Sequence, residues 1–157
     1  QGCFFPPVCS VREGRVLDVN KIHFILASVK NPEELKKEVF EILNCLRSEG
    51  HEIEPNKELY NKLAIPDDWD SLSVVFIKRL LQRELPQFLR SKIVEKLFVR
   101  HVTKNEAAFA RELYMNEEQL SMMVRNGMIV GSHGYEPGVD IATNKKIGSK
   151  VFLSLSG

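Results

Sequence analysis

The chain has 157 residues, the length of one typical domain. Hydrophobic residues make up 43% of it, so it can bury a core, which excludes a wholly disordered protein. The 22 Lys and Arg residues nearly balance the 21 Asp and Glu residues, giving a formal net charge of +1. A charge so close to zero gives no reason to expect a nucleic acid or an anionic membrane as a partner.

The cysteines bear on the compartment. Cys3, Cys9 and Cys45 are odd in number and show no C-x-x-C spacing, so we expect no disulfide framework. This favours a reducing compartment such as the cytoplasm, although the localisation is otherwise unknown. No apolar run reaches the ~18 residues of a membrane span, and no signal peptide is visible. Because the chain begins at Gln1 rather than at a methionine, we expect part of the protein to lie upstream.

Residues 1–10 are expected to form a strand and a loop. Cys3-Phe4-Phe5 is a short apolar run that Pro6-Pro7 stops, which favours a strand running into a rigid loop. A strand needs a partner for its backbone groups, and no strand precedes this one. We therefore expect an internal strand that has been separated from its sheet.

Residues 18–115 are expected to be helical. The first clear helix start follows Asn31, which can cap the helix, while Pro32 suits the first helical position. Glu34 can reach back as the far side of a capping box, and Gly50 suits the end of this helix.

Two further helices are expected from near Asp70 and from Pro86, and a shorter helical piece follows them. The apolar faces over 72–85 and 89–102 are wide, so we expect these helices to be packed on more than one side. Such faces can pack on the rest of a larger domain or meet a protein partner.

Residues 116–137 are expected to form a helix, a strand and a polar loop. Asn116 and Gln119 have capping-box spacing at the helix start, and a glycine ends the helix. The apolar run 128–130 then leads into Gly131-Ser132-His133-Gly134. This order is typical of parallel or barrel-like sheets, in which ligands bind at the carboxyl ends of the strands.

Of the four histidines, His133 is placed most like a functional residue. It lies between two glycines on a loop after a strand, where the backbone can approach a ligand closely. His23 and His101 lie in apolar helical stretches whose periodicity explains them. His51 follows a glycine at a helix end, where a cation can complement the helix dipole.

Two other features have both a structural and a functional interpretation. The stretch from Pro86 to Lys104 carries five Lys or Arg residues and one acid, and we interpret it as a solvated helix face rather than a phosphate contact. Trp69 is expected to pack beneath a helix start, with carbohydrate stacking as the alternative. No G-x-S-x-G elbow, phosphate loop or dinucleotide fingerprint is present, which argues against serine hydrolases and nucleotide-binding enzymes.

The sequence from Glu112 to Tyr135 resembles the second conserved block of the polysaccharide deacetylase family (carbohydrate esterase family four). In that family a helix carrying Glu-Gln-Leu and ending at a glycine leads into a strand and then Gly-Ser-His, with a second histidine four residues after the first. Residues 2–6, Gly-Cys-Phe-Phe-Pro, resemble the family's second strand. The helical stretch between the two blocks resembles an insertion found in a subset of the family.

The resemblance implies a fold and a chemistry. It implies an α/β fold in which this chain is a helix-rich fragment of a distorted (β/α) barrel. It implies a divalent metal, usually zinc, held by one Asp and two His. Such a metal lowers the pKa of its bound water and polarises the acetamide carbonyl, while an Asp acts as general base and a later His as general acid. The substrate class is an N-acetylated carbohydrate.

His133 is the one residue that carries over, as the first histidine ligand. The second ligand position is Pro137, which cannot coordinate a metal. Glu136 or Asp140 are the possible substitutes as oxygen ligands. No catalytic residue of the family matches a position in this chain, so we expect no deacetylase activity from it alone. The loss of the pattern after Glu136 fits a shift of reading frame, a chimeric join or a degenerate copy.

We therefore predict one partial domain over 1–157, with the divisions 1–10, 18–115, 116–137 and an atypical tail at 138–157. Two functions remain open. The first is a part of a metal-dependent carbohydrate deacetylase, and the second is a non-catalytic helical interaction module that kept the scaffold and lost the site. Anion binding by the basic helix is the least favoured alternative.

Overall fold

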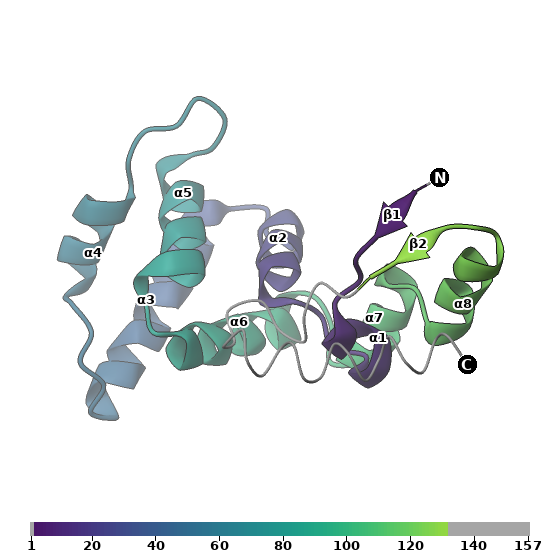
Figure 1. Cartoon of the computed structure of the whole chain (residues 1–157). Helices are drawn as coiled ribbons and strands as arrows, with labels where there is room; N and C mark the ends of the chain where they lie inside the picture. Colours follow the sequence, from purple (N-terminus) through teal and green to yellow (C-terminus); the bar gives the residue numbers. More distant parts are fainter. Residues whose placement is uncertain (1, 132–157) are drawn as a thin grey trace. The chain divides into compact units, whose positions relative to one another are not determined.

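The computed structural model describes residues 2–131, which form two compact units (Figure 1). Unit two is continuous, from Asp18 to Lys104. Unit one combines residues 2–17 with residues 105–131, so unit two is inserted into it in the sequence. Among the helices described, none combines the length and the apolar character that a membrane span requires.

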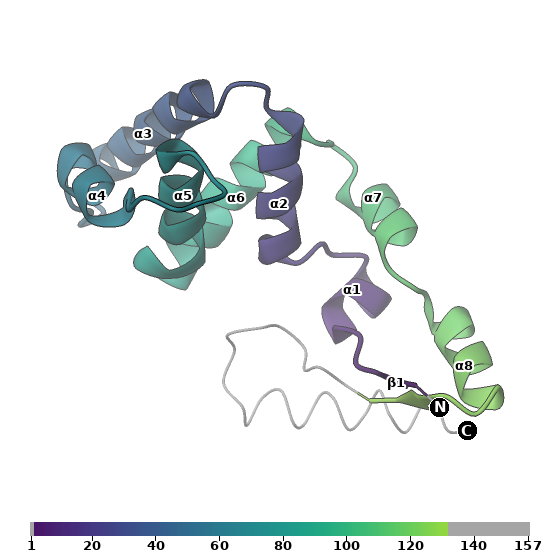
Figure 2. The same cartoon turned by 90° about the horizontal axis from the view of Figure 1, so that it is seen from above.

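Unit two is entirely helical in its regular structure. Its elements are α2 Asp18–Ser28, α3 Pro32–Ser48, α4 Asn56–Leu63, α5 Leu72–Arg79, the π-helical turn Leu80–Glu84 and α6 Gln87–His101. In Figures 1 and 2, α5 lies between α4 and α6, and α2 lies against α6. The predicted helix near Asp70 therefore begins at Leu72, and the one at Pro86 begins at Gln87.

The core of unit two consists of the apolar faces that the sequence predicted. Phe76 of α5 is fully buried, and its ring meets those of Phe40 and Tyr60 at centroid distances of 5.4 and 5.3 Å. On α6, Ile93, Val94, Leu97 and Phe98 are also fully buried. Most of the wide apolar faces of these helices thus pack inside unit two, while Leu72 and Val99 remain exposed.

An ion pair between a buried lysine and a half-exposed glutamate joins α2 to α6. The side chain of Lys21 is 6% exposed, and its Nζ lies 2.5 Å from Oε2 of Glu95. The same Nζ lies 5.3 Å from the centroid of the Phe98 ring, a cation–π distance. Breaking such a pair leaves a buried charge without its counter-charge, so this contact fixes how α2 lies on α6.

The helix starts largely follow the sequence signals. Asn31 caps α3 by accepting a hydrogen bond from the N–H of Glu33, with Pro32 at the first position. Glu34 does not complete a capping box, because its carboxylate accepts from the side-chain amide of Asn31 instead of from the backbone. The capping box predicted at the start of α8 is confirmed: Asn116 and Gln119 each accept from the backbone N–H of the other.

Unit one contains both strands. Its elements are β1 Cys3–Phe4, α1 Val8–Glu13, α7 Glu106–Leu113, α8 Glu117–Arg125 and β2 Ile129–Val130. Gly127 has φ 79°, a left-handed conformation that glycine adopts at low cost, and it turns the chain from α8 into β2 as predicted.

The predicted barrel is wrong. Of residues 2–131, 67% are helical and 3% lie in strands, and β1 and β2 form one two-stranded parallel sheet. A barrel requires a closed ring of strands. The apolar run 128–130, whose glycine-bounded position suggested a barrel-like sheet, forms only β2, one strand of this pair. The expectation that residues 3–5 lack a partner is also wrong, because β1 pairs with β2.

The carboxylate of Glu33 gives the stability of unit two a defined pH dependence. Lys36, at 2.5 Å, and the buried hydroxyl of Ser73 donate hydrogen bonds to it and lower its pKa. Its stabilising effect is therefore present above the unfolded-state pKa and is lost as the pH falls through the lower folded-state value. Because Glu33 is more than half exposed, we expect Glu33→Gln to cost less than about 1 kcal/mol at neutral pH.

Chemical denaturation of both proteins across acidic pH checks this expectation. The difference in the free energy of unfolding should close as the pH falls. Glu41→Gln, which removes an exposed carboxylate elsewhere on α3, is the matched control and should show a smaller difference. A difference for Glu33→Gln that stays constant with pH would contradict the assigned cause.

Candidate functional site

The candidate site lies at the carboxyl ends of β1 and β2. The strands run parallel, with Cys3 opposite Ile129 and Phe4 opposite Val130. The N–H of Ile129 donates to the carbonyl of Gly2 at 2.9 Å, and the N–H of Gly131 donates to that of Phe4 at 2.8 Å. Because parallel strands share one carboxyl edge, Gly131, which follows β2, lies beside Phe5, which follows β1.

Phe5 and Gly131 pack closely at this edge. A Cβ atom on Gly131 would lie 2.6 Å from Cε1 of the Phe5 ring, closer than real Cβ contacts come. The strand β2, which precedes Gly131, is buried on one side only, since Val130 is 6% exposed and Ile129 is 51% exposed. The absence of a side chain at Gly131 therefore lets the ring of Phe5 lie against its backbone.

The predicted metal ligand His133 lies outside the described residues, as do Glu136, Pro137 and Asp140. The structure therefore does not test their roles. Within residues 2–131, no group of three or more His, Cys, Asp or Glu side chains is arranged to hold a metal ion.

The other histidines have structural contacts. Nε2 of His101 lies 2.7 Å from Oε2 of Glu38, which also pairs with Arg100, so the end of α6 is tied to α3. His51 lies 3.9 Å from the carboxylate of Glu49 and its ring is 5.7 Å from that of Phe88. The contacts of His101 agree with its interpretation as a structural residue, and His51 lies just after the end of α3, where a cation can complement the helix dipole.

The basic face of α6 is partly neutralised within unit two. Lys92 pairs with Glu49 at 2.7 Å and lowers the pKa of that carboxyl group. Arg100 pairs with Glu38, and Arg90 donates to the carbonyl of Gln82. Three of the five basic side chains are thus used in contacts inside the unit, which favours a structural role for them.

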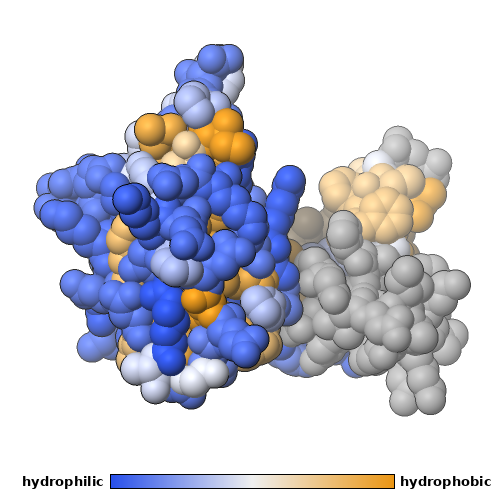
Figure 3. All heavy atoms as spheres, turned by 90° about the vertical axis from the view of Figure 1, so that its left-hand side faces the viewer, coloured by the Kyte–Doolittle hydropathy of each residue, from blue (hydrophilic) through white to orange (hydrophobic). Residues whose placement is uncertain are grey.

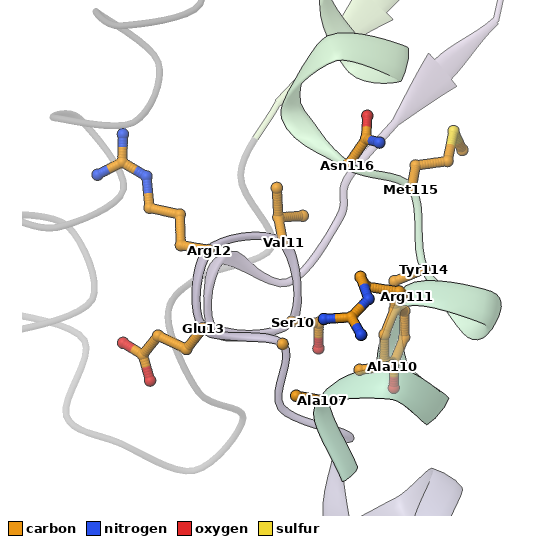
Figure 4. Close-up of a pocket in the computed structure, with 11 residues that line it drawn as sticks. Ser10, Val11, Arg12, Glu13, Ala107, Ala110, Arg111, Tyr114, Met115 and Asn116 are labelled. Carbon is orange, nitrogen blue, oxygen red and sulfur yellow. The ribbon is translucent and has the colours of Figure 1, made fainter. Parts of the chain in front are cut away.

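Unit one also contains a pocket of about 330 Å³ between α1, α7 and the start of α8 (Figure 4). The side chain of Arg111 points toward the buried Ser10 across it. Tyr114, on the same wall, accepts a hydrogen bond from the N–H of Leu17 at 3.2 Å. Arg12 pairs with Glu117 of α8 at 3.0 Å. The ion pair of Arg12 thus holds α1 against α8, and the bond from Leu17 ties the segment after α1 to the end of α7.

The sequence suggested that Trp69 packs beneath a helix start, and this prediction is wrong. It is 93% exposed on the loop that precedes α5. The helix start is instead capped by Ser71, whose hydroxyl accepts from the N–H of Val74 at 3.4 Å.

Comparison with known proteins gives no relationship. No protein-family model, no curated protein and no solved structure matches this chain significantly.

The contact between Gly131 and Phe5 is tested by adding a methyl group. Gly131→Ala should destabilise unit one by about 1 kcal/mol, at the low end of overpacking costs, because the half-exposed Phe5 ring can move aside. In a Phe5→Ala background the same substitution should cost less. Chemical denaturation of the four proteins of this double-mutant cycle measures the coupling, and an equal cost in both backgrounds would exclude the contact.

Proposed function

We propose that the chain is part of a carbohydrate deacetylase-like domain in which the loop after β2 contributes one histidine ligand, His133, to a divalent-metal site. One observation carries the proposal. The two blocks that resemble the family are separated by more than a hundred residues in the sequence, yet they meet as neighbouring parallel strands, Cys3–Phe4 and Ile129–Val130. Two unrelated chance matches have no reason to pair in register at the same sheet edge.

We expect that the residues of this chain do not complete a zinc site by themselves. Zinc sites in proteins use three or four protein ligands, whereas the matching positions here supply His133 and then Pro137, which has no side-chain donor. We therefore derive no catalytic step for the chain by itself. Its own contribution is to fix the start of the ligand-bearing loop through the strand pairing and the contact of Phe5 with Gly131.

The alternative is a non-catalytic helical interaction module. That function was expected to use the apolar faces of the helices at 72–85 and 89–102. Most of their large side chains are instead buried within unit two, apart from Leu72 and Val99, so these faces give the module little support. The deacetylase-like proposal is the stronger of the two because the strand pairing has no role in the module.

Acetate release tests the catalytic part of the proposal. The purified chain, incubated with an N-acetylglucosamine oligomer and zinc, should release no acetate above the blank, since a lone histidine does not hold zinc in a catalytic geometry. Enzymatic detection of acetate is the measurement. Release that depends on the chain would overturn the conclusion that it lacks a complete site.

Restoring the second ligand tests the role of His133. Pro137→His places two histidines four residues apart, and we expect it to raise the affinity for zinc by about tenfold or more. Competition with a chromophoric chelator measures the affinity. The gain should vanish when His133→Ala is added, and His51→Ala is the matched control that should leave it unchanged. A gain that survives His133→Ala would remove His133 from the proposed site.

A further inference from the structure

The loop between α4 and α5 carries an apolar patch that unit two leaves uncovered. Its side chains are Trp69, 93% exposed, Ile65, 50% exposed, and Leu72, 43% exposed. Figure 3 shows apolar side chains gathered at the top of this face, over that loop, with polar residues around them. Large aromatic side chains usually bury most of their surface, so a tryptophan in this position is unusual for a role in packing.

The loop is held in a defined conformation. Oδ1 of Asp67 accepts hydrogen bonds from the N–H groups of Trp69 at 2.9 Å and Asp70 at 3.4 Å, which forms a turn around the indole-bearing residue. Oδ2 of Asp70 lies 2.5 Å from Nζ of Lys78 on α5. A ligand that binds to this loop therefore meets a preorganised surface and loses little affinity to the ordering of the chain.

Three carboxylates neighbour Trp69 in the sequence. Asp67, Asp68 and Asp70 all lie within two residues of Trp69 in the sequence. Lys78 offsets Asp70, whereas Asp68 is exposed and makes no ion pair within the part of the chain that the structure describes. The face of an indole ring attracts cations, so the ring and the carboxylates favour the same kind of ligand.

We propose that this loop binds a chain of cationic amino sugars, with Trp69 as the stacking platform and Asp68 as the counter-charge. The ligand needs a flat apolar face for the indole and a positive charge for the carboxylate. A pyranose ring that carries a protonated amine has both. Extended peptides are bound along sheet edges or in grooves, and a single exposed ring on a loop offers neither.

This inference rests on the proposed function, because a de-N-acetylated sugar chain is the product of the reaction proposed for the domain. The loop would hold sugar units that have lost their acetyl groups while further units remain to be processed. The binding itself needs neither a metal nor catalysis, so it can be measured on this chain directly.

Trp69 is the one tryptophan of the sequence, so the intrinsic fluorescence reports on this loop alone. The full chain is titrated with a β-1,4-linked glucosamine tetramer at a pH that protonates the amines. An N-acetylglucosamine tetramer and tetralysine are titrated in parallel. We expect a saturable change in emission with the glucosamine tetramer and weaker binding of both other ligands, by about two- to fivefold or more.

Two variants assign the residues. Asp68→Asn should weaken binding of the glucosamine tetramer by about two- to fivefold and leave that of the acetylated tetramer unchanged. Glu41→Gln, which removes an exposed carboxylate from α3, is the matched control and should change neither. Trp69→Ala should abolish binding, as measured by isothermal titration calorimetry. Because the side chain is almost fully exposed, this variant is expected to fold normally.

The absence of a saturable change, or equal affinity for the acetylated tetramer, would overturn the proposal. Binding of tetralysine as tight as that of the glucosamine tetramer would also overturn it, because the loop would then select charge without a sugar. A failure here leaves the zinc affinity of the Pro137→His variant unaffected, so it is distinguishable from a failure of the proposed function.

Discussion

The parallel pairing of β1 with β2 is the constraint on which unit one depends. Two antiparallel strands can be joined by a tight turn, whereas a parallel pair needs a crossover connection. Here the crossover runs from Phe5 to Met128 and contains every helix of the described chain. The strands are short, and an isolated two-stranded sheet is marginal in water. Unit one therefore relies on the packing of β2 against α8 and on the burial of Val130 and Leu120.

The metal ligand and the sugar-binding loop that we propose belong to different units. The carboxyl edge of the strand pair, with Phe5 over Gly131, belongs to unit one and bears on the proposed metal loop. Unit two has its own core around Phe76 and Phe98, and its buried Lys21 pairs with the half-exposed Glu95. A helical unit with an independent core can carry a binding loop without contributing to the sheet, and the α4–α5 loop is the place where unit two exposes such a feature.

The sequence predicted features that depend on local chemistry. The cap at Asn31, the capping box of Asn116 with Gln119 and the turn at Gly127 each need only a few neighbouring residues. Helix α1 lies outside the predicted helical stretch 18–115 and was not predicted, because its six residues are too few for a periodicity to stand out. Helix α4 lies within that stretch, but its eight residues gave no separate signal.

The features that the sequence did not reveal depend on contacts between distant residues. The partner of β1 lies more than a hundred residues away in the sequence. The local pattern of apolar and polar residues in a single sequence does not identify such a partner. The exposure of Trp69 is likewise invisible in the sequence, because the same four residues, Asp-Asp-Trp-Asp, are compatible with a ring beneath a helix or a ring in solvent. The barrel was an inference from family resemblance, and the described strands do not form one.

Amide hydrogen exchange followed by NMR tests the strand pairing most directly. The N–H groups of Ile129 and Gly131 donate to the carbonyl groups of Gly2 and Phe4. The N–H group of Val130, which lies between them, therefore points away from β1. The pairing predicts slow exchange at Ile129 and Gly131 and faster exchange at Val130. Equal and rapid exchange at all three amides would contradict the pairing and, with it, the site at the carboxyl edge.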